Sequence, residues 1–196
     1  MNAISKIDVV AREEELQRKA QEILGDLQLM EVLEKCGTIK FVGGLALGLL
    51  CKKDIDIVVK NPPDYEKFLM VANHLFKQPR VSSLNLQDFR KSIHLDRPQG
   101  VYCGVSYLED KERGEYWKID IWFMEHSDAE DVVDWVKSKM KDEDRLTILK
   151  IKYDMVEKTE HGRDISGVDV YRSVLEGGAK DLEGFREYLK KQGREL

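Results

Sequence analysis

The sequence predicts an α+β fold, with a core of helices and short strands followed by a helical C-terminal part. Apolar residues recur at helical spacing near both ends of the chain, and short β-branched runs lie between them. Strand-like segments give way to helical ones near Glu125. We therefore expect residues 1–125 to form the core and residues 126–196 to form a helical extension packed on it.

The composition is that of a globular chain with an acidic balance. Of 196 residues, 42% are hydrophobic and 35% are charged, with both signs interspersed, so the chain can bury a core. Acidic residues outnumber basic ones by 37 to 32, which disfavours nucleic acid as a partner because the chain lacks an overall positive field. The three cysteines form no CxxC pair, and the sequence has no signal-like or membrane-spanning run. We expect a cytoplasmic protein with reduced thiols and no membrane contact.

The N-terminal part of the chain predicts helices and two strands around a pair of glycines. Apolar residues at three- and four-residue spacing indicate a helix, with Gly25 as a candidate division point. Short β-branched runs indicate strands, and the paired glycines indicate a tight turn between them. The expected segments are a helix over 12–35, a strand over 38–42 (TIKFV), a short helix over 45–50 and a strand over 55–59.

The middle of the chain predicts a helix followed by antiparallel strands. Pro62 and Pro63 end the preceding strand and open the helix. Short alternating runs separated by polar turns over 81–124 indicate two to four largely antiparallel strands. The last run, 116–124 (YWKIDIWFM), places Asp120 on the face opposite to most of its apolar residues.

The C-terminal part predicts amphipathic helices. Ser127 and Glu130 have the spacing of a capping box, which indicates the start of one helix. Asp128, Glu130 and Asp131 in its first turn complement the helix dipole, although one of them is an alternative general base. Further apolar stripes near Leu149, in GVDVYRSVL and near Leu189 predict helices up to the end of the chain.

Asp54 and Asp56 are the most informative residues for chemistry. Because strand side chains alternate, residues two apart project from the same face, so the two carboxylates lie side by side. Two like charges at that separation repel each other, which raises one pKa unless a cation neutralises them. A hard divalent ion with oxygen ligands, such as Mg²⁺, suits the pair and can bridge it to substrate phosphates.

Gly43, Gly44 and Asp120 complete the candidate site. Glycines have no β-carbon, so the amides that begin the following helix can approach an anion, and a phosphate fits opposite the carboxylates. Asp120 is the third acid that a two-metal site needs beside an attacking hydroxyl. Together these residues indicate phosphoryl or nucleotidyl transfer.

Other polar and aromatic residues have simpler explanations. Lys52 and Lys53 precede the acids and could contact a triphosphate, and Lys150 and Lys152 on the C-terminal helices could close over it, but we expect all four to be solvated. No histidine has a Cys or His partner at metal-ligand spacing, which favours packing or surface roles. Trp122 shares a strand face with Asp120 and is a candidate for stacking on a base or sugar.

The order of these motifs resembles the nucleotidyltransferase superfamily, which includes DNA polymerase beta, antibiotic nucleotidyltransferases, poly(A) polymerases and CCA-adding enzymes. The resemblance covers roughly residues 38–124 and rests on Val42, Gly43 and Gly44, then Asp54 and Asp56, then Ile119, Asp120 and Ile121. It implies a mixed β-sheet flanked by helices, in which the three acids bind two Mg²⁺ ions and the glycine turn holds the triphosphate. A substrate hydroxyl then attacks the α-phosphate, and pyrophosphate leaves.

Length and acidity point to one part of this superfamily. CCA-adding enzymes share the Gly-Gly turn and the lysine before the Asp-x-Asp motif, but they have a long basic body for tRNA. The short acidic chain is more similar to the small stand-alone antibiotic-type nucleotidyltransferases. Gly44 and Lys53 stand where many members have serines, so the substrate cannot be carried over from the family.

The resemblance therefore predicts a Mg²⁺-dependent nucleotidyltransferase that transfers a nucleoside monophosphate from an NTP, with ATP expected, to the hydroxyl of a small molecule or a protein. Asp54 and Asp56 would hold both ions, Asp120 would hold the ion beside the acceptor, and Gly43 and Gly44 would bind phosphate. Two alternatives stay open: a non-catalytic binding or regulatory module of the same fold, antitoxin-like, and a metal-dependent phosphohydrolase. The sequence does not determine the acceptor, the base preference or the oligomeric state.

Overall fold

A computed structural model describes residues 6–92, 98–157 and 165–196. In these residues a single five-stranded sheet has the order β1-β2-β5-β4-β3. The strands are β1 (Thr38–Val42), β2 (Asp54–Lys60), β3 (Val81–Asp88), β4 (Val101–Asp110) and β5 (Glu115–Met124). β2 and β5 run parallel to each other, whereas the other neighbours pair antiparallel. The predicted α+β fold with a mixed sheet is therefore confirmed.

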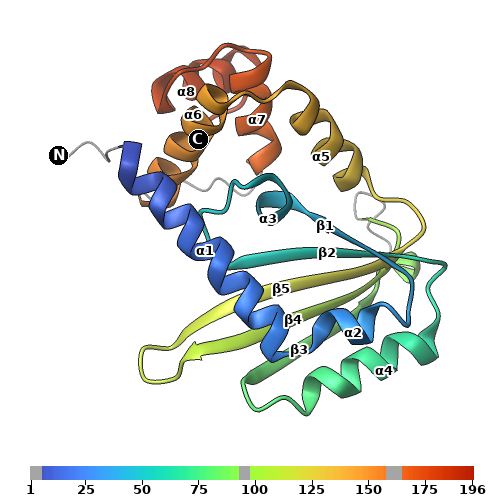
Figure 1. Cartoon of the computed structure of the whole chain (residues 1–196). Helices are drawn as coiled ribbons and strands as arrows, with labels where there is room; N and C mark the ends of the chain where they lie inside the picture. Colours follow the sequence, from blue (N-terminus) through green and yellow to red (C-terminus); the bar gives the residue numbers. More distant parts are fainter. Residues whose placement is uncertain (1–5, 93–97, 158–164) are drawn as a thin grey trace.

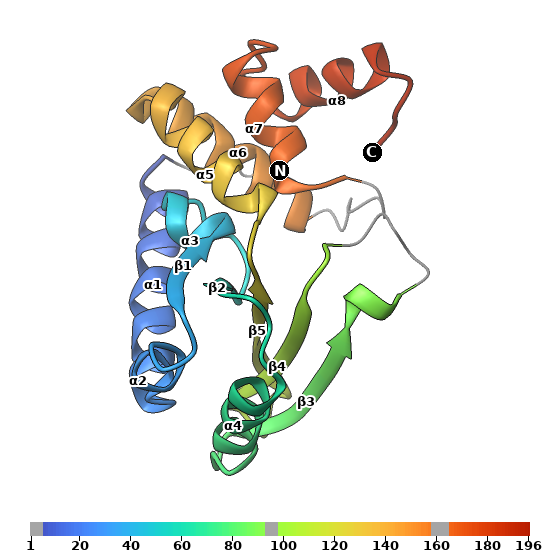
Figure 2. The same ribbon diagram turned by 90° about the vertical axis from the view of Figure 1, so that its right-hand side faces the viewer.

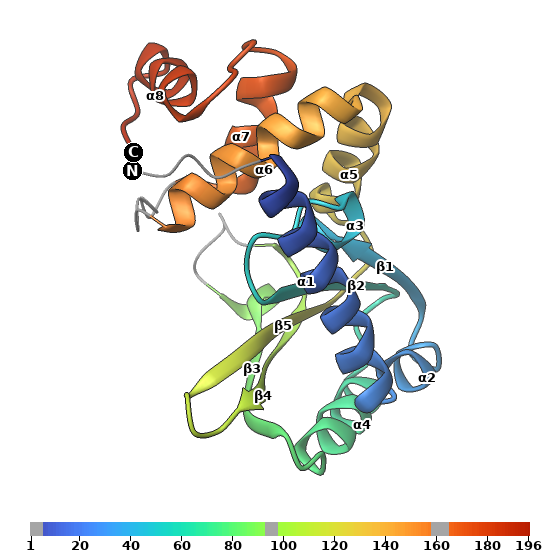
Figure 3. The same ribbon diagram turned by 60° about the vertical axis from the view of Figure 1, so that its left-hand side comes forward.

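Helices lie over one face of the sheet and at one end of it (Figures 1, 2 and 3). In Figures 1 and 3, α1 crosses the sheet and α5 to α8 gather at one end of it, whereas Figure 2 shows β3 at the opposite edge from β1. The described helices are α1 (Lys6–Asp26), α2 (Leu29–Leu33), α3 (Gly43–Leu47), α4 (Tyr65–Phe76), α5 (Asp128–Lys139), α6 (Asp142–Glu157), α7 (Gly167–Leu175) and α8 (Leu182–Lys191), with a short 3₁₀ turn at Phe89–Lys91.

Two apolar cores stabilise this arrangement. The first lies between one face of the sheet and α1, α2 and α4, and includes the fully buried Ile55, Ile57, Ile119 and Ile121. The second joins the C-terminal helices to α1, α3 and the opposite face of the central strands, and includes Val9, Val58, Met124, Ile148 and Phe185. Because the second core contains residues from both sides of position 125, the C-terminal helices pack directly on the sheet. The division into two parts at that position stays a prediction.

The break in the N-terminal helical region differs from the expected one. α1 continues through Gly25 and ends at Asp26, and the chain turns at Gln28, which has a left-handed backbone with φ 49°. Leu27 and Leu29 on either side of this turn are buried, so packing into the first core stabilises the break. The glycine pair also differs, since Gly43 and Gly44 are the first residues of α3 rather than a separate turn before it.

The predicted capping box at Ser127 and Glu130 is wrong. Ser127 is the N-cap of α5, but its side chain accepts no capping hydrogen bond, and Glu130 instead pairs with Lys60 of β2 at 3.2 Å. The side chain of Glu130, which a capping box requires, therefore forms a tertiary ion pair instead. The capping box that forms is at α7, where Ser166 and Asp169 bond each other's backbone amides.

β5 has the alternation that the sequence predicts. Trp117, Ile119 and Ile121 are fully buried in the first core, and Phe123 is only 3% exposed. Lys118, Asp120 and Trp122 therefore project from the other face. This alternation brings one acid to the sheet face on which Asp54 and Asp56 also lie.

Candidate metal and nucleotide site

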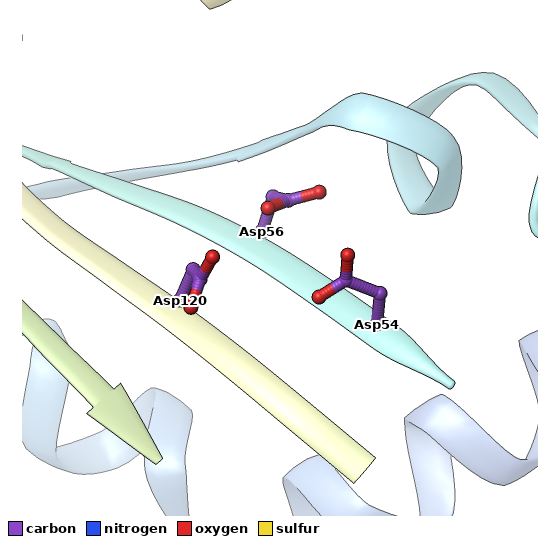
Figure 4. Close-up of side chains that lie close together, drawn as sticks. All are labelled: Asp54, Asp56 and Asp120. Atoms are coloured by element: carbon purple, nitrogen blue, oxygen red, sulfur yellow. The ribbon is translucent and has the colours of Figure 1, made fainter. Parts of the chain in front are cut away.

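Three carboxylates converge on one face of the central strands. Asp54 and Asp56 come from β2 and Asp120 comes from β5, and in the parallel register Asp56 lies directly beside Asp120. Figure 4 shows the three side chains together above these strands, and one oxygen from each lies within 4.8 Å of the others. The three acids expected to form one site are thus brought together, although they are up to 66 positions apart in the sequence, from 54 to 120.

The electrostatics of this cluster favour a cation. Burial raises the pKa of Asp56 to about 7, and the neighbouring charges of Asp54 and Asp120 add to this rise. Burial also raises the pKa of Asp54, where Lys118 acts in the opposite direction. Oδ1 of Asp54 is buried and has no hydrogen-bond partner. An orphaned carboxylate oxygen within a set of oxygen ligands fits a hard divalent ion such as Mg²⁺.

Asp120 has two protein donors. Tyr102 Oη donates to its Oδ1 at 2.6 Å, and Lys118 Nζ donates to its Oδ2 at 2.5 Å. Burial and the hydrogen bond to Asp120 raise the pKa of Tyr102 well above its ordinary value, so the phenol stays protonated and donates. The third acid is therefore held from β4 as well as from its own strand.

The first glycine of α3 packs against one of the acids. Gly43 has φ 62°, and a β-carbon built on it would lie 2.4 Å from Oδ2 of Asp56. Both the left-handed backbone and the missing side chain are therefore required at this position. Gly44 has a different role: it lines the neighbouring pocket, and its β-carbon position lies 3.1 Å from the carbonyl oxygen of Leu49.

A pocket of about 300 Å³ lies beside the carboxylates. Its walls come from the segment between α3 and β2, from β2 itself, and from α6 and α7. The lining residues that bear on ligand binding are Gly44, Asp54, Asp56, Lys152, Ser166 and Tyr171. Carboxylates, an ammonium group and glycine backbone in one pocket are groups that suit a metal-bound phosphate ligand.

The prediction that Lys152 is solvated is wrong, and the alternative, that Lys152 contacts a triphosphate, stays a prediction. Its half-buried side chain lines the pocket, where Nζ donates to the carbonyl oxygen of Leu49 at 2.6 Å and to Tyr171 Oη at 3.4 Å. Desolvation lowers the pKa of Lys152, but Tyr171 and the charges of Cys51 and Asp56 outweigh it, so the net pKa is raised and the group stays cationic. The sequence pattern that indicates its burial is its position on α6, four residues after the buried Ile148 and on the same helix face.

Lys53 and Trp122, two further residues considered from the sequence, contact neighbouring side chains. Lys53 pairs with Glu109 at 2.5 Å and with Glu115. Trp122 packs against Tyr102, with ring centroids 4.8 Å apart, and against Phe89 at 5.2 Å.

Of the histidines, His74 contacts the carbonyl oxygen of Leu27 at 2.8 Å, which is the packing role expected for it. His94 and His161 lie outside the described residues. Among the described residues, no helix combines the length and the apolar character needed to cross a membrane.

A buried ion pair holds the segment that leads into the pocket. Glu13 of α1 is 1% exposed and accepts hydrogen bonds from Arg145 Nη2 at 2.8 Å and Gln17 Nε2 at 2.8 Å. The backbone amide of Leu50 also donates to Glu13 at 3.4 Å, and Arg145 Nε donates to the carbonyl oxygen of Gly48 at 3.1 Å. Sequence reasoning missed this pair because its members lie 132 positions apart.

Solved structures of other proteins identify the fold of this chain. No protein-family profile matches the sequence, and no curated protein matches it. A structure of the Cid1 poly(U) polymerase bound to MgATP is similar over 84% of this chain and 50% of that chain, with a TM-score of 0.61 and 16% identity. A cytoplasmic RNA terminal U-transferase is similar over 85% and 53%, with a TM-score of 0.57 and 14% identity. The chain thus spans about half the length of these two structures, and it has the nucleotidyltransferase fold.

Proposed function

We propose that this chain is a Mg²⁺-dependent nucleotidyltransferase. It transfers a nucleoside monophosphate from an NTP, with ATP the expected donor, to a hydroxyl group, and releases pyrophosphate. The observation that carries the proposal is the convergence of Asp54, Asp56 and Asp120 beside a pocket that contains Lys152. The nucleotidyltransferase fold supports it.

The three acids divide the metal ligation. Asp54 and Asp56 hold two divalent ions, and Asp120 shares the ion beside the acceptor hydroxyl. When bound, such ions polarise the phosphoryl oxygens and lower the pKa of the attacking hydroxyl. The orphaned Oδ1 of Asp54 and the raised pKa of Asp56 support this assignment, because both describe carboxylates that lack sufficient positive charge.

The rest of the pocket binds the nucleotide. The ammonium of Lys152 interacts with the triphosphate, because it is a cation that lines the same pocket as the two acids of β2. Tyr171 is buried in the second core and contacts Lys152 through both its ring, whose centroid lies 5.5 Å from Nζ, and its hydroxyl, so it positions the ammonium beside the nucleotide. Gly44 lines the pocket at the start of α3, and its backbone amide is the group that we assign to phosphate binding.

The acceptor is a small molecule or a protein. The solved structures similar to this chain include enzymes described as acting on RNA, but the formal charge of −5 on this chain disfavours a long polyanion. A non-catalytic regulatory module of the same fold, or a phosphohydrolase, would use the same carboxylates without nucleotidyl transfer.

One assay distinguishes these functions. The chain is incubated with Mg²⁺, each NTP labelled at the α-phosphate, and a panel of small hydroxyl compounds and proteins. We expect the label to appear on an acceptor with one pyrophosphate released per transfer, and we expect Asp54→Asn and Asp56→Asn to abolish both. Asp134→Asn, an exposed aspartate on α5, is the matched control. Phosphate release without a labelled acceptor indicates a phosphohydrolase, and nucleotide binding without turnover indicates a regulatory module.

A further inference from the structure

Both carboxylate oxygens of Asp120 accept a hydrogen bond from a side chain of the protein. Tyr102 Oη donates to Oδ1 at 2.6 Å, and Lys118 Nζ donates to Oδ2 at 2.5 Å. One donor is neutral and the other is charged, and they come from different strands. The two oxygens of this acid are therefore held in different ways.

The contact between Tyr102 and Asp120 depends on Gly104. In the register of β4 and β5, Tyr102 pairs with Trp122, whereas Gly104 pairs with Asp120. The tyrosine ring therefore leans along the strand, over Gly104, to reach the acid. A β-carbon built on Gly104 would lie 2.4 Å from Oη and 2.9 Å from Cζ of Tyr102. Any side chain larger than hydrogen at position 104 would displace the hydroxyl.

Aromatic packing holds the Tyr102 ring. Its centroid lies 4.8 Å from that of Trp122 and 6.1 Å from that of Phe89. A ring held by aromatic neighbours and by the space at Gly104 keeps its hydroxyl in one position, and such fixed donors orient the carboxylates of metal sites.

Lys118 occupies the other oxygen from a more exposed position. Its side chain is 53% exposed, whereas that of Asp120 is 14% exposed. In the parallel register Lys118 lies beside Asp54, so its charge acts on the whole cluster. Lys118 is the cation that acts most strongly on Asp54 and Asp56, ahead of Lys152. A divalent ion at Oδ2 repels the ammonium of Lys118, whereas the neutral hydroxyl of Tyr102 keeps its bond to Oδ1.

We propose that Tyr102 is a permanent positioning residue for Asp120, and that Lys118 is a built-in cation which a divalent ion displaces from Oδ2. The inference rests on the proposed function and deepens it, because it describes how the metal site is loaded. Lys118 partly compensates the three carboxylates before the ion arrives and competes with it afterwards. The ion beside the acceptor would therefore bind weakly to the protein alone. The phosphate oxygens of a bound nucleotide would supply further ligands, which raise the affinity of the ion enough to displace Lys118.

Calorimetric titration of the full chain with Mn²⁺, without nucleotide, tests both roles. Lys118→Met is expected to bind Mn²⁺ roughly ten-fold more tightly, because a competing charge has been removed. Tyr102→Phe is expected to bind it roughly ten-fold more weakly, because a ligand carboxylate has lost its orienting donor. Lys118→Arg keeps the competing charge and should stay close to the starting affinity. Lys139→Met, at an exposed lysine paired with Glu176, controls for the change in net charge.

The outcomes separate this inference from the function on which it rests. If Lys118→Met binds Mn²⁺ with unchanged or lower affinity, the proposed competition is wrong. The metal site is still supported in that case if Asp56→Asn abolishes Mn²⁺ binding. Unchanged binding by Tyr102→Phe overturns the positioning role. If neither the unsubstituted chain nor Lys118→Met binds Mn²⁺, the metal site and this inference both fail. Thermal unfolding of each variant identifies loss of fold, and unfolding cannot imitate the tighter binding expected of Lys118→Met.

Discussion

The β-carbon position of Gly43 lies 2.4 Å from Oδ2 of Asp56. The carboxylate of the second acid of β2 therefore occupies the space that a side chain on the first residue of α3 would need. The positive φ of Gly43 turns the chain from β1 into α3, and β2 pairs antiparallel with β1. The conformation of the turn and the position of the Asp56 carboxylate therefore depend on each other, although the two motifs are separate in the sequence.

Gly43→Ala is expected to lower the free energy of unfolding and to weaken divalent-ion binding. The left-handed backbone alone costs roughly 1–2 kcal/mol for a residue with a β-carbon, and the contact with Asp56 adds to this cost and moves the carboxylate. Urea denaturation and Mn²⁺ titration measure the two effects. Gly114→Ala is the matched control, because Gly114 has φ 66° but no atom within 4 Å of its β-carbon position. Equal losses in the two variants would show that the contact with Asp56 has no effect.

Without a divalent ion, the stability of the chain is expected to fall as the pH rises from about 4 to about 7. An unfolded aspartate titrates near its ordinary pKa of about 3.9, whereas burial and the neighbouring Asp54 and Asp120 raise the pKa of Asp56 to about 7. Between these values the folded state binds more protons than the unfolded state, so deprotonation costs folded stability.

This pH dependence can be measured by urea denaturation in EDTA near pH 5 and near pH 8. Asp56→Asn should lose less stability than the unsubstituted chain between the two conditions. Adding Mg²⁺ near pH 8 should stabilise the unsubstituted chain more than Asp56→Asn. A parallel pH response in both proteins would contradict the assignment of the raised pKa to Asp56.

Lys152→Met is expected to weaken NTP binding roughly ten-fold, because a charge-assisted hydrogen bond to phosphate is lost. Equilibrium binding of a fluorescent NTP in the presence of Mg²⁺ measures this effect. Lys150→Met is the matched control, since Lys150 lies on the same helix but does not line the pocket. Similar affinities for the two variants would remove Lys152 from the nucleotide site.

Arg145→Met is expected to destabilise the chain by about 3 kcal/mol, because it leaves the buried carboxylate of Glu13 without its charged partner. The double variant with Glu13→Gln should recover part of the loss. Arg18→Met, which removes an exposed pair with Glu22, should cost no more than about 1 kcal/mol. Chemical denaturation of the four proteins measures these differences, and equal losses at Arg145 and Arg18 would show that burial of the pair does not matter.

Much of the local structure could be predicted because it depends on neighbouring residues. β1 and the alternation of β5 have the predicted positions and faces, since short β-branched runs and period-two patterns act within a few residues. The break at Gln28 and the side chain of Glu130 could not be predicted in this way. The first follows from burial of Leu27 and Leu29, and the second from an ion pair with Lys60 on another element.

The sequence by itself determined the chemical groups of the candidate site. The spacing of Asp54 and Asp56 places both carboxylates on one strand face, and the apolar residues around Asp120 place this acid opposite the first core. Only the tertiary structure decided that these faces coincide, because the parallel pairing of β2 with β5 joins segments separated by four other elements. It also decided that Lys152 lines the pocket and that Tyr102 and Lys118 hold Asp120. Strand register and helix packing depend on contacts between residues far apart in the chain, and no local pattern encodes them.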